Sequence, residues 1–262
     1  MKKFIKNIYL IFKLFGFDIL AFFSTLVSLP FYFKDFLKIK KQKNKDKTFI
    51  FGSCYPILNE RFSNSGVMSG HYFHQDLYIA KKIFVNNPPR HLDIGSRTDG
   101  FVAHVAVFRE IEVVDIRMQE SKINNIIFTQ MDLMKLPENF VNSYESISSL
   151  HAVEHFGLGR YGDRVDYFGY LKVLENIYKM LKVDGKFYFS VPIGEQRIEF
   201  NAHRVFSLAY LISLFQDKYK IESFSYVNDQ GDLFENVSLE EKNISINFGC
   251  HYGCGIFELV KI

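Results

Sequence analysis

Short apolar runs alternate with amphipathic segments between residues 71 and 262, and this alternation constrains the fold most strongly. The runs that have the length and apolar content of buried strands are residues 91–94, 111–116, 125–130, 146–150, 186–191, 220–227 and 255–262. Helical spacing is found at residues 71–84, 101–108, 165–181 and 206–215. This order predicts an α/β domain with a mostly parallel sheet that helices cover on both faces. Ligands of such sheets bind at the carboxyl ends of the strands, where the strand order reverses.

The composition supports a folded domain with a sizeable core. Of the 262 residues, 48% are hydrophobic, and 29 Phe and 15 Tyr exclude an intrinsically disordered chain. Six Pro and 16 Gly exclude a collagen-like chain, and a mean hydropathy of −0.03 excludes a polytopic membrane protein. Three Cys are too few for a disulfide framework, so we expect a reducing compartment.

The charge divides the chain into an arm, residues 1–47, and a body, residues 48–262. The arm holds eleven Lys and three Asp, a net charge of +8, whereas the body holds 21 basic and 26 acidic residues, a net charge of −5. A basic arm on a mildly acidic body is typical of a segment that meets an anionic surface. Nucleic acid is not expected as a partner, because the Lys run lacks Arg and the body is acidic.

The arm is also strongly apolar. Its uninterrupted apolar run, residues 19–33, has 15 residues, fewer than the roughly 20 that a spanning helix needs. Pro30 is expected to bend or end a helix there. Lys13 and Asp18 interrupt the region that a signal peptide would keep apolar, and no cleavage motif follows.

Seven Lys follow this apolar run between residues 34 and 47. Each Lys near an anionic leaflet contributes about 1 kcal/mol to binding. We therefore predict a helix that lies on an anionic membrane surface, followed by a polybasic segment. This places the protein in the cytoplasm, peripheral on the inner face of the membrane. The alternative is a helix packed on the body or on a partner, followed by a solvated Lys linker.

Polar residues follow the first three predicted strands. Gly95 permits a tight turn before a helix, whose N–H groups would point into the crevice. Asp115 ends the second strand twenty residues later, the spacing at which an acidic residue reaches a ribose hydroxyl. Residues 131–133, which include Asp132, end the third strand and can approach an adenine edge. Together these positions predict an adenosine-containing ligand; the alternative is an ordinary α/β domain with acidic strand ends.

These segments resemble the motifs of the class I, Rossmann-like S-adenosylmethionine-dependent methyltransferases. LDIGS (92–96), VVDI (113–116) and MDL (131–133) look like the first three motifs, and LKVDGKFYFSVP (181–192) resembles a later one. The resemblance implies a seven-stranded sheet of order 3-2-1-4-5-7-6, with an antiparallel seventh strand at residues 255–262. It also implies S-adenosylmethionine as the cofactor. The cofactor-binding residues that it implies are Asp93, Gly95, Ser96, Gly100, Asp115, Ile116, Asp132 and Leu133.

A closer resemblance is to an uncharacterised family of methyltransferase-like proteins that carries a domain-of-unknown-function label. It is carried by segments such as GHYFHQD (70–76), LHAVEHFGLGRYGD (150–163) and FSVPIGEQRIEFNAHRVFS (189–207). That family is often encoded with bacterial surface-polysaccharide genes. The resemblance implies O-methylation of a sugar or of a surface-polysaccharide intermediate. The alternative is a non-catalytic, methyltransferase-like binding or assembly protein at the membrane surface, with a sealed cofactor site.

One motif departs from the pattern of the class. Arg97 and Asp99 stand where the first motif normally has its second and third Gly, and Gly100 comes one place late. Glycine at these positions lets the backbone approach the ligand. Three outcomes are open for Arg97: it crowds the cofactor, turns away, or contacts a phosphate or carboxylate of the substrate.

The segment HAVEH (151–155) matches the inverted zinc-protease pattern, which requires a helix. Here it follows a strand and is soon broken by glycines, so a zinc protease is not expected. We predict instead that His151 or His155 is the base of methyl transfer and that Glu154 orients one of them. Alternatively, these residues only hold the loop through hydrogen bonds.

Polar residues after the fourth and fifth strands are candidates for substrate binding. Arg160 and Asp163 lie in a Gly-rich loop and suit sugar hydroxyls or a phosphate. The alternative for this loop is a plain connection. Arg197 and His203 belong to a second polar wall, after the fifth strand, for which the alternative is a buried polar network. No metal is expected, because His71 with His74, and Cys250 with Cys254, supply too few ligands close together in the sequence.

Overall fold

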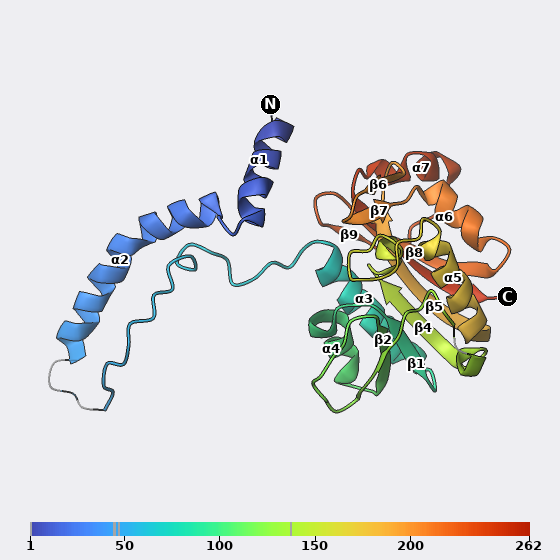
Figure 1. The fold of residues 1–262 in the computed structure, drawn as a ribbon, viewed down its shortest axis with the longest axis horizontal. Coiled ribbons are helices and arrows are strands. Elements are labelled where there is room, and N and C mark those ends of the chain that lie inside the picture. Colours follow the sequence, from blue (N-terminus) through green and yellow to red (C-terminus); the bar gives the residue numbers. More distant parts are fainter. Residues whose placement is uncertain (1, 44–45, 47, 137) are drawn as a thin grey trace. The chain divides into compact units, whose positions relative to one another are not determined.

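The computed structural model describes residues 2–43, 46, 48–136 and 138–262, and the chain divides into two compact units, Met1–Val67 and Met68–Ile262. The first unit contains the helices α1 (Lys2–Leu14) and α2 (Ile19–Lys43) (Figure 1). The carboxylate of Asp18 caps α2, because its Oδ1 accepts the backbone N–H groups of Leu20 (3.0 Å) and Ala21 (3.1 Å).

The expectation that a helix ends at Pro30 is not met, because α2 runs on to Lys43 with Pro30 inside it, whereas a bend at Pro30 stays a prediction. Proline forfeits one bond, from its own nitrogen to the carbonyl four residues earlier, and the turns on both sides keep theirs. As a result the helix has 25 residues and is long and apolar enough to cross a membrane, by length and composition alone. The 15-residue apolar run in the sequence did not indicate this.

The second unit is built on an eight-stranded sheet of order β3-β2-β1-β4-β5-β10-β8-β9 (Figure 1). Its strands are β1 (His91–Ile94), β2 (Ile111–Asp115), β3 (Ile126–Gln130), β4 (Tyr144–Leu150), β5 (Leu181–Ile193), β8 (Tyr219–Val227), β9 (Leu233–Phe234) and β10 (Gly253–Lys261). The neighbours from β3 to β5 are parallel, and β10 is antiparallel to both β5 and β8. The predicted fold class is confirmed, since β8 and β10 are the sixth and seventh strands of the order 3-2-1-4-5-7-6. A short edge strand, β9, is added.

Helices cover both faces of this sheet (Figure 1). On one face α3 (His71–Asn86) and α4 (Ala103–Ala106) contribute to an apolar cluster with Tyr188 and Ile256. On the other face α5 (Gly169–Met180) and α6 (Leu208–Phe215) pack in a cluster with Phe187 and Phe257. Because side chains of a strand alternate between faces, neighbouring residues such as Phe187 and Tyr188 belong to different clusters.

The remaining elements are short. They are the π-helical turn η1 (Thr98–Val102), the 3-10 turns η2 (Glu138–Phe140), η3 (Val153–His155) and η4 (Asn247–Gly249), the helix α7 (Glu241–Ser245), and a separate two-stranded sheet of β6 (Arg197–Glu199) and β7 (His203–Val205). The predicted helix at 101–108 therefore consists of the end of η1 followed by α4. Gly100, inside η1, has non-helical backbone angles.

The helix predicted at 165–181 ends at Met180, and β5 begins at once. Asp184 and Gly185 thus lie inside β5, where the register against β4 shifts. Asp184 has a positive φ of 61°, so the Asp-Gly pair forms an irregularity in the strand.

Candidate active site

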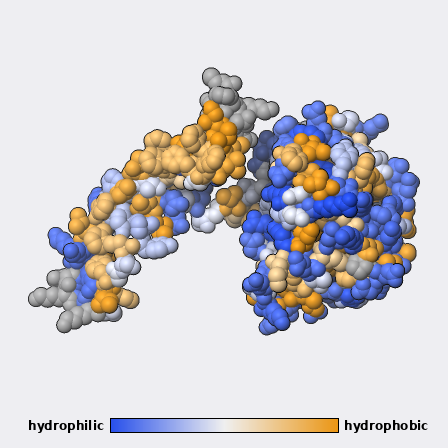
Figure 2. Space-filling model, in the orientation of Figure 1, coloured by the Kyte–Doolittle hydropathy of each residue, from blue (hydrophilic) through white to orange (hydrophobic). Residues whose placement is uncertain are grey.

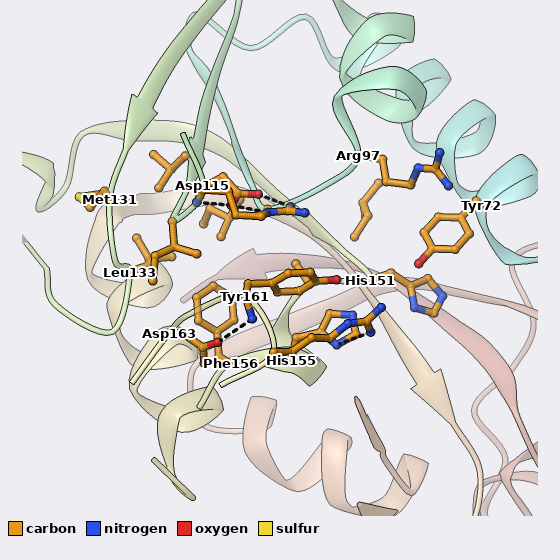
Figure 3. Close-up of a pocket in the computed structure, with 18 residues that line it drawn as sticks. Tyr72, Arg97, Asp115, Met131, Leu133, His151, His155, Phe156, Tyr161 and Asp163 are labelled. Atoms are coloured by element: carbon orange, nitrogen blue, oxygen red, sulfur yellow. Dashed lines mark hydrogen bonds and ion pairs between the residues drawn. The ribbon is translucent and has the colours of Figure 1, made fainter. Parts of the chain in front are cut away.

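A cavity of about 410 Å³ opens at the carboxyl ends of β1, β2 and β4 (Figure 3). Its volume lies in the range of about 300–1,000 Å³ that small-molecule sites occupy. Eight of the residues predicted from the sequence line it: Gly95, Asp115, Ile116, Leu133, His151, His155, Arg160 and Asp163. The other seven lie outside its lining: Asp93, Ser96, Gly100, Asp132, Glu154, Arg197 and His203.

Gly95 forms the turn after β1 and the floor of the cavity. Its φ is 68°, and its N–H donates to the Val114 carbonyl at 2.9 Å. A Cβ atom at this position would lie 3.1 Å from Cβ of Ala152. Both the left-handed backbone and the close approach therefore require glycine here, and they keep the floor open.

Asp93 and Ser96 stabilise this turn through hydrogen bonds to each other. The Asp93 carboxylate is fully buried and accepts the Ser96 N–H (3.0 Å), the Ser96 hydroxyl (2.7 Å) and the Ser148 hydroxyl (2.6 Å). Burial raises the pKa of Asp93 to about 6, although these hydrogen bonds oppose the shift. Gly100 faces Asp76, whose Oδ2 would lie 2.6 Å from an added Cβ. These residues shape the turn rather than the cavity surface.

Arg97 and Asp99 bind each other. Arg97 donates from Nε to Oδ1 (3.0 Å) and from a terminal nitrogen to Oδ2 (2.8 Å) of Asp99. The guanidinium lies 5.6 Å from the ring centroid of Tyr72, and Figure 3 shows it directed away from Asp115. Of the outcomes that the sequence left open, the structure shows the side chain turned to the rim of the cavity.

Asp115, at the end of β2, is held by Arg117. Its Oδ1 accepts the Arg117 backbone N–H (2.8 Å) and Nε–H (3.0 Å), and its Oδ2 accepts a terminal N–H at 2.6 Å. The Arg117 guanidinium in turn lies 4.4 Å from the centroid of the Tyr161 ring. Because each carboxylate oxygen can accept two hydrogen bonds, Oδ2 keeps one lone pair for a ligand.

Apolar side chains form the wall beyond Asp115. Met131 and Leu133 lie at one end of the lining in Figure 3, with Tyr72 and His151 at the other. The neighbouring Asp132 accepts the Met134 backbone N–H on Oδ1 (3.0 Å), so it holds the turn. This end of the cavity suits a planar ring with few polar edges.

His151 follows β4 and forms a buried pair with Glu154. Its Nδ1 lies 2.7 Å from Oε1 of Glu154. Among the described residues, neither Nε2 of His151 nor Oε2 of Glu154 has a hydrogen-bond partner. Burial lowers the pKa of His151, but Cys254 and Glu154 outweigh burial and hold that pKa well above its usual value. His151 also has a positive φ of 51°, a strained backbone that is common at functional sites.

His155 lies in η3, one short 3-10 turn, so HAVEH lacks the α-helix that the zinc-protease motif requires. Its Nδ1 lies 2.7 Å from the carbonyl of Ala202, and since a carbonyl only accepts, Nδ1 carries the proton. Nε2 therefore presents a lone pair. Burial lowers the pKa of His155, although Glu154 opposes the shift, which favours the uncharged ring.

In the Gly-rich loop, Asp163 binds the backbone of its own loop, whereas Arg160 binds the connection between β6 and β7. Asp163 accepts the backbone N–H groups of Gly157 (2.7 Å), Gly159 (3.3 Å) and Tyr161 (3.2 Å). Arg160 donates to the Ala202 carbonyl (2.9 Å). These contacts organise the Gly-rich loop as one wall of the cavity.

The polar wall after β5 lies farther away. Arg197 donates to Glu199 (2.9 Å) and to the His251 carbonyl (3.1 Å). The ring of His203 lies 5.0 Å from that of Tyr252, measured between centroids, and its Nε2 lies 3.4 Å from Glu199. Both side chains thus belong to a polar network beside the cavity.

A second cavity, also of about 410 Å³, shares Tyr72 and His151 with the first. Its lining consists of Ser69, Gly70, His71, Tyr72, His151, Asn228, Asp229, Gln230, Gly231 and Tyr252. The His71 ring stacks on the His151 ring, with centroids 5.1 Å apart and planes at 9°. Burial, followed by the neighbouring His151, lowers the pKa of His71 to about 4. His151 therefore stands at a junction of two cavities.

Sequence reasoning missed Tyr72, Arg117 and Tyr161 as cavity residues. Arg117 stands two residues after Asp115, and this spacing alone was a usable signal for a carboxylate–guanidinium pair. Tyr72 and Tyr161 had no local signal, because their positions depend on how α3 and the Gly-rich loop meet the sheet.

The model of the family described as "Caenorhabditis protein of unknown function, DUF268" matches residues 101–248. The chain belongs to the DUF268 family. The predicted membership of an uncharacterised family is confirmed to that extent. Since the description names no function, the link of the DUF268 protein to surface-polysaccharide genes stays a prediction. Among the curated proteins, no match to the chain is found.

Solved structures share the fold of the DUF268 protein. The [4+2]-cyclase SpnF has a TM-score of 0.50 at 12% identity, covering 72% of this chain and 80% of that chain. A chain from the complex between the Haloferax volcanii Trm112 methyltransferase activator and the putative methyltransferase has a TM-score of 0.50 at 14% identity, covering 72% and 89%. The N-methyltransferase NodS from Bradyrhizobium japonicum WM9, in complex with S-adenosyl-L-homocysteine, has a TM-score of 0.48 at 11% identity, covering 73% and 88%.

At these identities the similarities to SpnF and to the Haloferax volcanii chain, both with a TM-score of 0.50, show the fold of the DUF268 body, a methyltransferase-like α/β domain, and nothing finer. The presence of a cyclase beside methyltransferases illustrates that this fold supports more than one reaction. The reaction must therefore be argued from the cavities and their side chains.

Proposed function

We propose that the DUF268 protein is an S-adenosylmethionine-dependent methyltransferase that methylates an oxygen of its acceptor. The observation that carries this proposal is the pair of cavities that share Tyr72 and His151. Transfer between two substrates needs a donor site and an acceptor site that meet where the reacting atoms lie. A sugar or surface-polysaccharide intermediate is the acceptor class that the sequence resemblance implies, and we keep it as part of the proposal.

The first cavity fits the cofactor. The open floor at Gly95 would admit the methionine end, and the free lone pair of Asp115 Oδ2 would accept a ribose hydroxyl. Met131 and Leu133 would flank the adenine. When bound, the cofactor supplies a methyl group on a sulfonium. The pairing of Arg97 with Asp99 keeps both side chains at the rim, which supports a cofactor site that stays open rather than sealed.

The second cavity fits a polar acceptor. Asn228, Asp229 and Gln230 line it, and the Asp229 carboxylate is fixed by the backbone N–H groups of His251 and Tyr252, both at 2.9 Å. An acceptor there would reach the first cavity past His151.

Methylation of a hydroxyl releases its proton, so a base is needed. His155 suits this role, because its Nδ1 is bound to the Ala202 carbonyl and its Nε2 is free to accept. His151, which Glu154 fixes at the junction, would orient the acceptor oxygen. Of the two histidines that the sequence offered as the base, the hydrogen bond to Ala202 therefore favours His155.

Isothermal titration of the full-length chain with S-adenosylhomocysteine tests the proposal. We expect saturable binding of one ligand per chain, and we expect Asp132→Asn to bind as the parent does, because that carboxylate holds a turn outside the cavity. A folded protein that shows no heat of binding at millimolar ligand would overturn the cofactor assignment.

We also propose that the first unit binds the inner, cytoplasmic face of a membrane. Large apolar side chains of α2, among them Leu20, Phe23 and Leu37, are exposed in the structure, as Figure 2 shows for the visible face of this helix. Lys40, Lys41 and Lys43 follow in its last turn. An exposed apolar surface beside a cationic end matches the interface between acyl chains and anionic headgroups.

Sedimentation with vesicles that contain phosphatidylserine tests this second proposal. The full chain is expected to sediment, and a chain that lacks residues 1–47 is expected to stay in the supernatant. Release by about 1 M salt, where the Debye length falls to about 3 Å, indicates binding mainly through the Lys residues, whereas retention indicates that apolar side chains of α2 are buried in the bilayer. Equal sedimentation of both chains would refute a membrane role for the arm.

A further inference from the structure

We propose that His71, His151 and Cys254 bind a divalent transition-metal ion, zinc in the first place, at the junction of the two cavities. Their ligand atoms lie within 4.8 Å of one another. The three residues come from separate elements: the first turn of α3, the residue after β4, and β10. The existence of this site is independent of methyl transfer, whereas its role in catalysis rests on the proposed function.

The distances suit a tetrahedral ion after a small adjustment. Zinc binds imidazole nitrogen at about 2.0–2.1 Å and thiolate sulfur at about 2.3 Å, so its ligand atoms stand about 3.4–3.6 Å apart. Atoms that are 4.8 Å apart would therefore have to approach by about 1.2–1.4 Å. The rings of His71 and His151 are stacked with planes at 9°, so their in-plane lone pairs run nearly parallel, and at least one ring would have to rotate to direct its nitrogen at the ion.

The Glu154 carboxylate prepares His151 as a ligand. It accepts the Nδ1 proton of His151 at 2.7 Å, so Nε2 is the nitrogen left for a metal ion, which would displace the proton there. That Nε2 is buried and has no hydrogen-bond partner among the described residues. A buried polar atom without a partner is unfavourable, and coordination to a metal ion would satisfy it. A carboxylate behind a ligating histidine is also the usual outer shell of zinc sites.

Cys254 is available as the third ligand. Its side chain is fully buried, and its thiol makes weak contacts with Oε1 of Gln75 at 3.7 Å and with the Gly255 carbonyl at 3.9 Å. Cys250, its neighbour in the CHYGC motif, instead lies 4.0 Å from the Phe248 carbonyl. Only one thiol of this motif therefore belongs to the cluster, which explains why the sequence alone predicts no metal site.

The chemistry of the donors selects the ion. Two imidazoles and one thiolate favour zinc and similar borderline-soft ions over magnesium or calcium, which prefer oxygen. Three protein ligands leave one position open, as in catalytic zinc sites. The second cavity is lined by both His71 and His151, so it leads to this position. An ion there would hold the acceptor oxygen and lower the pKa of its hydroxyl.

Cobalt(II) and zinc titrations of the full-length, metal-free protein test the site. We expect one equivalent of cobalt per chain and a near-ultraviolet thiolate-to-cobalt charge-transfer band. Cys254→Ser should abolish this band and His71→Asn should weaken zinc binding, whereas the matched controls Cys250→Ser and His74→Asn should leave both unchanged. Glu154→Gln should weaken zinc binding about 10- to 100-fold.

Two outcomes overturn the inference: no stoichiometric binding by the folded parent, or a charge-transfer band that survives Cys254→Ser. Circular dichroism of each variant shows whether it is folded. The cobalt titration of the parent tests the site even if a variant does not fold. Titration with S-adenosylhomocysteine separates the two proposals. Ligand binding without metal binding refutes the metal site alone, and metal binding without ligand binding refutes the cofactor assignment alone.

Discussion

Asp115→Asn isolates the contact through which the first cavity would hold a ribose. The carboxylate accepts three hydrogen bonds from Arg117 and keeps one lone pair on Oδ2 for a ligand hydroxyl. The amide has the same size, but it is uncharged, and one oxygen becomes an NH₂ donor. That donor either faces a donor of Arg117 or takes the place of the acceptor that the hydroxyl needs.

The expected effect on binding is larger than the effect on folding. A hydrogen bond to a charged group contributes about 1.5–3 kcal/mol, so losing it raises the Kd about 10- to 100-fold. The ion pair with Arg117, whose side chain is 51% exposed, contributes only about 1 kcal/mol to stability. The variant should therefore remain folded, and its weaker binding should be measurable.

Isothermal titration with S-adenosylhomocysteine is the assay, and Arg117→Gln is the matched control. This control removes the cation but leaves both Asp115 oxygens, so its Kd should stay within about threefold of the parent value. If Asp115→Asn binds like the parent while Arg117→Gln loses affinity, the guanidinium and not the carboxylate contacts the ligand. That result would refute the ribose assignment.

Two further changes probe the strands beneath the cavity. Gly95→Ala should lower the free energy of unfolding by about 1–2 kcal/mol, because φ is 68° and the new Cβ would lie 3.1 Å from Ala152; a loss below about 0.5 kcal/mol in urea denaturation would contradict this. Burial between the hydroxyls of Ser146 and Ser148 lowers the pKa of His91 to about 3. The unfolded chain therefore takes up a proton between pH 6.5 and 3 that the folded chain does not, and the parent should lose about 2 kcal/mol more than His91→Asn between pH 7 and 5. Equal losses would show that His91 does not contribute to acid sensitivity.

The sheet was predictable because local patterns determine its strands. The segments HLDI (91–94) and KFYFSV (186–191) are short apolar runs, which neighbouring residues specify without reference to the rest of the chain. The strand predicted at 186–191 begins earlier, at Leu181, because Asp184-Gly185 forms an irregularity inside β5 rather than a break before it. The helix likewise continues past Pro30, because the helical turns on both sides of the proline keep their hydrogen bonds.

The site was predictable only in part. Asp93, Asp115 and Asp132 all follow the same strand-end pattern, yet only Asp115 lines the cavity. Sequence position indicates where a strand ends, whereas hydrogen bonds with the adjoining turn decide where a carboxylate points. The approach of Cys254 to His151 depends on β10 lying beside β5, a long-range pairing that no local pattern reveals.

The pairing of Arg97 with Asp99 has a consequence for the energetics of ligand capture. A loop with glycine at both positions samples many backbone conformations, and binding must order it. Side chains at these positions reduce the number of backbone conformations that the unfolded chain samples, which stabilises the folded loop by about 0.4–1 kcal/mol per replaced glycine. Because the two charges are opposite and bind each other, the mouth of the cavity also gains no net charge. The loop is thus ordered before the ligand arrives, and reverting either residue alone would leave an unmatched charge at the entrance.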